Sequence, residues 1–77
     1  MQKEITLDAR DLPPPEPLFQ ALDRLNAMAP GEYLRLLIHR EPMMLYPQLD
    51  EMKIPWKVLE HGHPDWVILI GPLPERR

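Results

Sequence analysis

The sequence predicts an α+β fold, a two-layer α/β sandwich in which a mixed four-stranded sheet carries two helices on one face. Two observations predict it. Strand-like and helix-like patterns of apolar residues alternate along the 77 residues in the order β-α-β-α-β-β. In addition, a strand–helix–strand unit joins parallel strands by a right-handed crossover, so two successive units place both helices on the same face of the sheet.

The first half of the chain supplies a short strand, predicted at residues 4–7, and the longer helix. The helix is predicted from Pro15 to about Met28, because proline is tolerated in a first turn and apolar residues then recur at helical spacing. These residues are Leu18, Leu22, Leu25 and Ala29, with Phe19 and Ala21 beside them. We expect Leu22 and Leu25 to pack on the sheet, and Pro30-Gly31 to end the helix.

The second half supplies the other helix and three strands. Residues 33–39 alternate imperfectly and predict a strand. A helix is predicted between about Pro42 and Met52, and Pro47 should make it start late or kink, since an interior proline breaks the hydrogen-bond ladder. The last two strands are predicted at Trp56–Glu60 and Trp66–Ile70, joined by a hairpin turn at 61–65.

Composition excludes several classes of protein. The net charge is −3 and lysine and arginine form no dense cluster, which argues against a nucleic-acid partner. The apolar runs are too short for a membrane span and no signal-peptide pattern opens the chain, so we expect a cytoplasmic protein. Cysteine is absent, which excludes thiol chemistry. We expect one domain over 1–77, with its core at about 4–71 and a frayed tail at 72–77.

The stretch Leu7–Pro17 carries the most specific pattern, Leu-Asp-x-Arg-x-Leu-x-x-Pro-x-Pro. It resembles the signature of the TusA/SirA-like sulfur-carrier family. The resemblance implies a sheet order of 1-2-4-3 with the last strand antiparallel to the others. In that family a reactive cysteine precedes the Pro-x-Pro, whereas this chain has Pro14 there. The element His39-Arg40-Glu41-Pro42, followed by Leu45 and Leu49, is similar to a cysteine-less, uncharacterised branch of the superfamily.

Titratable side chains are predicted to gather at the edge where parallel strands end, which is where open α/β sheets bind ligands. The candidate binding residues at this edge are Asp8, Arg10, His39, Arg40 and Glu41. Arg40 could hold a carboxylate or phosphate, and His39 could act as acid, base or ligand. The structural alternative is a surface ion pair between Asp8 and Arg10, with His39 covering the sheet.

A metal site is the second candidate at the same edge. His39, His61 and His63 each follow a strand that should run parallel to the others, and Asp65 or Glu41 could complete a divalent-metal shell. The alternative for His61 and His63 is a polar hairpin turn. Met43 and Met44 are expected to fill gaps in the core rather than bind a soft metal.

The sheet face away from the helices is the third candidate, as an interaction surface. The last predicted strand is apolar on both faces, and Leu37, Val67 and Leu69 share the face that the helices leave open. With no catalytic motif in the chain, the leading hypothesis is a small non-enzymatic binding or interaction module that pairs with a protein partner or a second copy. One alternative is a regulatory domain that binds a metal or a small ligand, and another is an accessory protein in sulfur or redox metabolism. Apart from a possible divalent metal, we expect no cofactor.

Overall fold

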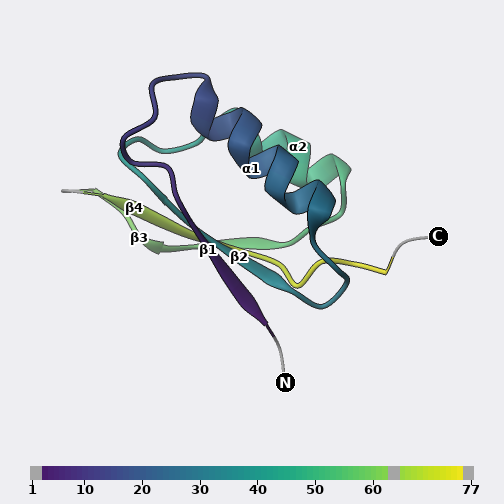
Figure 1. Cartoon of the computed structure of the whole chain (residues 1–77). Coiled ribbons are helices and arrows are strands. Elements are labelled where there is room, and N and C mark those ends of the chain that lie inside the picture. The colour runs from purple at the N-terminus through teal and green to yellow at the C-terminus, as the bar shows by residue number, and fades with distance from the viewer. Residues whose placement is uncertain (1–2, 63–64, 76–77) are drawn as a thin grey trace.

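The computed structural model describes residues 3–62 and 65–75 and confirms the predicted fold class (Figure 1). Its elements are β1 (Glu4–Asp8), α1 (Glu16–Ala27), β2 (Tyr33–Ile38), α2 (Leu45–Glu51), β3 (Trp56–Glu60) and β4 (Trp66–Ile70). The four strands form one sheet in the order β1-β2-β4-β3, and Figure 1 shows both helices on the same side of it. In the described part of the chain, neither helix is long and apolar enough to cross a membrane.

The strand directions bring three chain segments to one edge of the sheet. β1 and β2 are parallel, and β4 runs antiparallel to both β2 and β3. Strands β1, β2 and β3 therefore point the same way and end, at Asp8, Ile38 and Glu60, along what we call the carboxyl edge. The loops that lead into the two helices both start from this edge.

The core forms between the helices and the facing side of the sheet. β2 alternates strictly, so that Leu34, Leu36 and Ile38 are buried toward the helices while the intervening side chains stay half-exposed. Leu36 pairs with Ile68 of β4, which is also fully buried. The central strands thus supply the floor on which both helices pack.

The buried stripe of α1 is rotated from the one that the leucine spacing predicts. Its buried residues are Pro17, Ala21 and Leu25, and Met28 just beyond the helix continues the stripe. Leu25 packs in the core as predicted, whereas Leu22 is only partly buried and Ala29 is exposed. Leu22 packs against the core cluster but at its margin, because small Ala21 lets the helix sit close to the sheet and centres the contact one residue earlier.

Helix α2 starts late, as Pro47 predicts, and ends in a defined turn. Leu45 is its first residue, so Pro47 stands in the first turn, where its missing N–H costs no intrahelical bond. At the other end Ile54 donates its N–H to the Leu49 carbonyl and Lys53 donates to Asp50, the pair of bonds of a Schellman turn. Lys53 takes the left-handed position at φ 59°, where glycine is usual.

The segment after β4 is held against the domain at least as far as Leu73. The sequence, in contrast, predicts a frayed tail from residue 72. Leu73 is 4% exposed and belongs to the core cluster. Its N–H donates to the Glu32 carbonyl and its own carbonyl accepts from Gly31. Gly71 permits this path because its φ is +135° and a Cβ there would lie 2.8 Å from the Glu32 carbonyl oxygen.

The open face of the sheet, away from the helices, is covered by none of the described elements (Figure 1). Leu37 and Leu69 are half-exposed there, while Val67, opposite Leu37, is already 8% exposed within the single chain. An ion pair between Arg35 and Glu4 (2.7 Å) crosses the same face and raises the pKa of Arg35. The exposed apolar area on this face is therefore a narrow strip between charged side chains.

Candidate functional site

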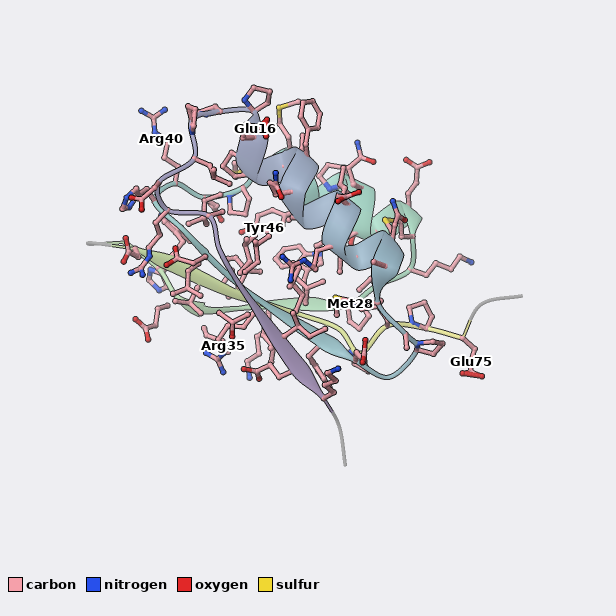
Figure 2. The ribbon with its side chains drawn as sticks, in the orientation of Figure 1. Glu16, Met28, Arg35, Arg40, Tyr46 and Glu75 are labelled. Carbon is pink, nitrogen blue, oxygen red and sulfur yellow. The ribbon has the colours of Figure 1, made fainter. Side chains whose placement is uncertain are left out.

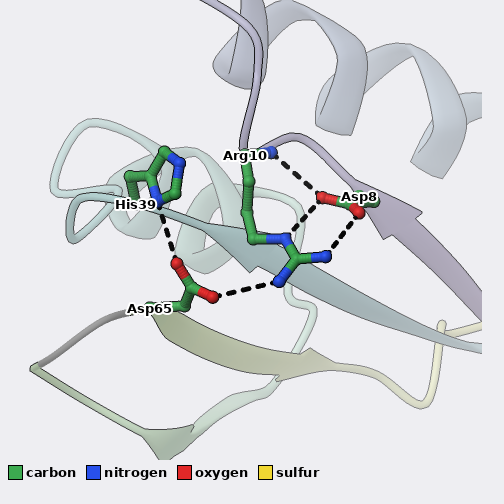
Figure 3. A network of polar contacts seen from close by, with 4 residues as sticks. All are labelled: Asp8, Arg10, His39 and Asp65. Carbon is green, nitrogen blue, oxygen red and sulfur yellow. Dashed lines mark hydrogen bonds and ion pairs between the residues drawn. The ribbon is translucent and has the colours of Figure 1, made fainter.

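Arg10 is the centre of a polar network at the carboxyl edge (Figure 3). Its Nε donates to Oδ1 of Asp8 and its Nη2 donates to Oδ2, both at 2.8 Å, which makes a bidentate pair. The backbone N–H of Arg10 also donates to Asp8, at 3.2 Å. Asp8 ends β1, so this short-range pairing fixes the start of the loop that leads into α1.

Asp65 joins this pair to the neighbouring strands. Nη1 of Arg10 donates to one Asp65 oxygen at 3.0 Å, and Nδ1 of His39 lies 2.8 Å from the other. Asp65 stands just before β4 and His39 just after β2, so four residues from three separate stretches of the chain meet at one edge (Figure 3). The network holds the loop after β1 and the entry to β4 in a fixed relation.

The network sets the charge of its carboxylates. The hydrogen bonds from the Arg10 side chain, with its backbone N–H, lower the pKa of Asp8 to about 2. The same guanidinium, with a smaller effect from His39, lowers the pKa of Asp65, and the two carboxylates raise the pKa of Arg10. Both acids are therefore ionised near neutral pH, and the Arg10 charge is matched by its neighbours.

The contact with Asp65 determines what His39 can offer a ligand. An ionised carboxylate only accepts hydrogen bonds, so Nδ1 of His39 must be the protonated nitrogen that donates to Asp65. In the neutral imidazole Nε2 is then an acceptor. The His39 side chain is 58% exposed, so this acceptor is accessible to a hydrogen-bond donor or a metal ion.

A pocket of about 440 Å³ lies on the helix side of the same edge. Two segments line it, residues 9–18 before and in α1 and residues 36–45 between β2 and α2. Its floor is made by buried Leu36 and Ile38, and most of its wall is proline, leucine and methionine. This volume lies within the usual range for ligand sites, which are mainly apolar with a few oriented polar groups.

The polar side chains of the pocket differ in how firmly they are held. Arg10 and His39, held by the network, line the pocket together with Arg40 and Glu41. Glu41 accepts a hydrogen bond from the Tyr46 hydroxyl at 3.2 Å, and burial together with this bond raises the pKa of Tyr46 to about 12. Arg40 is exposed and makes no hydrogen bond or ion pair with another residue of the described part.

The tyrosine that holds Glu41 is itself fixed by an aromatic stack. The Tyr46 ring lies parallel to the Trp56 ring at a centroid distance of 3.9 Å, and the indole N–H donates to Asp50 at 3.2 Å. This stack fastens α2 to the edge strand β3. It also holds the start of α2, whose first residue, Leu45, lines the pocket.

The start of α1 offers no cradle for an anion, although helix N-termini often do. Pro15 and Pro17 have no N–H, and Glu16 donates its own to the Pro13 carbonyl. The amides of Leu18 and Phe19 both donate to the Pro15 carbonyl. The backbone N–H groups of the first turn are therefore all hydrogen-bonded within the protein. The acidic side chain of Glu16 further disfavours a negative ligand.

The predicted site residues are partly brought together. Of the candidate binding residues, Arg10, His39, Arg40 and Glu41 line the pocket and Asp8 holds Arg10. Two of the residues proposed as metal ligands, His39 and His61, have different neighbours. The ring of His61 lies 5.9 Å from the Trp66 ring, whereas His39 contacts Asp65.

The metal prediction is not tested by this structure, because His63 lies outside the described residues. Within 3–62 and 65–75, no group of three or more histidine, aspartate or glutamate side chains is arranged to hold a metal ion. Asp65 contacts Nδ1 of His39. A carboxylate at this nitrogen orients the imidazole for a metal bound at Nε2 and is not itself a metal ligand.

The sequence indicated the polar residues of the site but not its walls. Met43 and Met44 were expected in the core, yet they are 62% and 74% exposed and line the pocket. That expectation is wrong because α2 begins only at Leu45, which leaves both methionines in the loop outside the helix. The delay that Pro47 imposes on α2 was the available signal.

Comparison with known proteins places the chain in a family. A search of the curated proteins and a search of the solved structures found no match. A family model described as "Uncharacterized conserved protein (DUF2249)" matches residues 6–72. The match spans both helices, all but the first residues of β1, and every other strand. The chain therefore belongs to the DUF2249 family of uncharacterised conserved proteins.

Proposed function

We propose that this protein is a small non-enzymatic binding module, and that its ligand places an apolar group in the pocket between residues 9–18 and 36–45. The observation that carries the proposal is the pocket itself, about 440 Å³ with apolar walls, beside a histidine and an arginine already fixed by hydrogen bonds. Prepositioned polar groups give specificity at little entropic cost, since they need not be ordered when the ligand binds.

The scaffold supports the same proposal. The sheet order is the 1-2-4-3 order that the resemblance to TusA/SirA-like proteins implies. Pro14 stands at the position of that family's reactive cysteine, and Pro14 lines the pocket. We propose that the scaffold is TusA-like and that an apolar wall replaces sulfur chemistry at this position. A role in sulfur or redox metabolism would then be indirect.

A neutral fluorescent probe tests the proposal. N-phenyl-1-naphthylamine is apolar and uncharged, and its emission rises in a dry pocket. We expect saturable binding to the wild-type protein. Met44→Glu should weaken it, because a carboxylate at the mouth opposes an apolar guest. Leu59→Glu is the matched control, since Leu59 is also an exposed large hydrophobic residue but lies on β3, outside the pocket. Equal loss in both variants, or no binding to wild type, would refute the pocket as the site.

The open face is a second candidate site, for a second copy of this chain. Leu37 and Leu69 are half-exposed on adjacent central strands, which is the observation in its favour. Val67 on the same face is already buried within the single chain, and the Arg35–Glu4 ion pair crosses the face. We therefore place the pocket first.

The three-histidine metal site stays a prediction. Its support is the accessible Nε2 of His39, oriented by Asp65. A zinc titration followed by the imidazole NMR signals tests it: selective shifts of the His39, His61 and His63 signals near one equivalent support a regulatory metal site. Unchanged signals would remove it.

A further inference from the structure

We infer that the occupant of the pocket is a basic amphipathic helix of a protein partner, which inserts an apolar side chain between the two loops. This inference rests on the proposed function and names its ligand. It is carried by two features of the described residues, the apolar surface around the pocket mouth and the charge of the surrounding loops.

The apolar surface extends beyond the cavity. Met43, Met44 and Phe19 are 62%, 74% and 56% exposed, and Leu59 is the remaining large hydrophobic side chain exposed in the described part. Both methionines line the pocket, and Phe19 follows the lining residue Leu18 in the first turn of α1. A small molecule in the cavity would contact the methionines on their pocket side but leave their outer surface and Phe19 in water, whereas a helix laid across the mouth would cover them. Methionine suits such a surface because its unbranched chain adapts to the shape of the guest.

The charge of the site points to a basic partner. The loops around the pocket, with Asp65, carry five acidic and two basic side chains: Asp8, Asp11, Glu16, Glu41, Asp65, Arg10 and Arg40. These seven side chains therefore carry a formal net charge of −3. Figure 2 shows Glu16 and Arg40 at this end, with Glu75 at the opposite end.

Anionic ligands are disfavoured by the same features. Arg10 is neutralised by Asp8 and Asp65, and the first turn of α1 has no free backbone donor. Arg40 is the one guanidinium here without a partner among the described residues, and it is exposed. A basic helix that packs its apolar side into a groove would meet acidic side chains on both loops, a recognised mode of peptide binding. In that complex Arg40 is a like charge that weakens binding.

The test uses two model peptides and the ¹⁵N-labelled protein. One is an amphipathic helix of leucine and lysine, about five turns or ~18 residues long. The other has glutamate in place of every lysine. We expect the lysine peptide to shift the amide signals of residues 10–19 and 39–46, with an affinity that falls as salt is added. The glutamate peptide should leave them unchanged.

Three charge variants sharpen the test. Arg40→Glu should tighten binding of the lysine peptide and Asp11→Lys should weaken it, each by about two- to fivefold, the effect of one exposed charge pair. Glu75→Lys is the control for Asp11→Lys, because it makes the same charge change at the opposite end of the molecule and should leave the affinity as it was. Each of the three side chains is exposed, and the peptide comparison on the wild-type protein needs no variant.

The outcomes separate this inference from the proposed function. Equal binding of both peptides, shifts confined to another surface, or equal affinities for Arg40→Glu and Asp11→Lys would overturn the basic helix. If N-phenyl-1-naphthylamine still occupies the pocket in that case, the proposed function stands and its ligand is a small molecule. If neither the probe nor either peptide reaches the pocket, both proposals fail.

Discussion

Truncation of Leu25 tests how α1 is seated on the sheet. Leu25 is 0% exposed, belongs to the core cluster and lies in the buried stripe of the helix. Leu25→Ala removes three buried carbon atoms and leaves a cavity, because the floor made by β2 and β4 cannot collapse into it. The usual cost of such a change is about 2–5 kcal/mol.

This cost is large beside the stability of so small a domain. At roughly 0.05–0.15 kcal/mol per residue, 77 residues give about 4–12 kcal/mol. Leu25→Ala should therefore remove at least about a sixth of the free energy of unfolding. Leu22→Ala is the matched control: its side chain is only partly buried, so we expect a loss of about 1–2 kcal/mol.

Urea melts followed by tryptophan fluorescence measure both values, since Trp56 and Trp66 pack against the core. The midpoint should fall much further for Leu25→Ala than for Leu22→Ala, with the slope unchanged. If Leu22→Ala costs as much as Leu25→Ala or more, the helix is seated as the leucine spacing predicts and the packing described above is wrong.

Four other predictions follow from the site and its surroundings. Because the folded pKa of Asp8 is lowered to about 2, its stabilisation is present above pH ~4 and lost as pH falls toward about 2, and the lowered pKa of Asp65 acts in the same direction; urea melts across this range should show the loss, and Asp8→Asn should reduce it. The pKa of Tyr46 is raised to about 12, so stability should fall between pH ~10 and ~12, and Tyr46→Phe should abolish the late rise in tyrosinate absorbance. Lys53→Gly should raise the free energy of unfolding by about 1 kcal/mol in a denaturant melt, since it removes a side chain from a left-handed position. If two copies pair through the open face, native mass spectrometry should show a dimer that Leu69→Lys converts to monomer; a wild-type monomer at high concentration would exclude this pairing.

The order of the strands and helices could be predicted from the sequence because each element carries its own periodicity. Trp56–Glu60 and Trp66–Ile70 are strands with the predicted bounds, and the early proline of α2 delayed its start as expected. The rotation of α1 could not be predicted, since Leu22 and Ala21 both suit a buried stripe and only the close approach of helix and sheet decides between them.

The candidate site was predictable where topology alone decides. Parallel strands end at the same edge, so the meeting of Arg10 with His39 near one pocket follows from the strand order. The partner of both, Asp65, is a different case. The sequence indicates it only as a metal ligand, because its place opposite His39 depends on the register of β4 against β2. Val67 is predicted to belong to the interaction surface but is buried by its own neighbours. Leu69 is more exposed, so a lysine there tests the interaction surface with less effect on the fold.

The central claim is that the pocket, and not the open face of the sheet, receives the apolar part of a ligand. Intermolecular NOEs between the ring protons of N-phenyl-1-naphthylamine and protein methyl groups test it most directly. We expect NOEs to the methyls of Ile38 and Met44, which line the pocket. NOEs to Leu37 and Leu69 in their place would put the guest on the open face and show that the pocket is not the site.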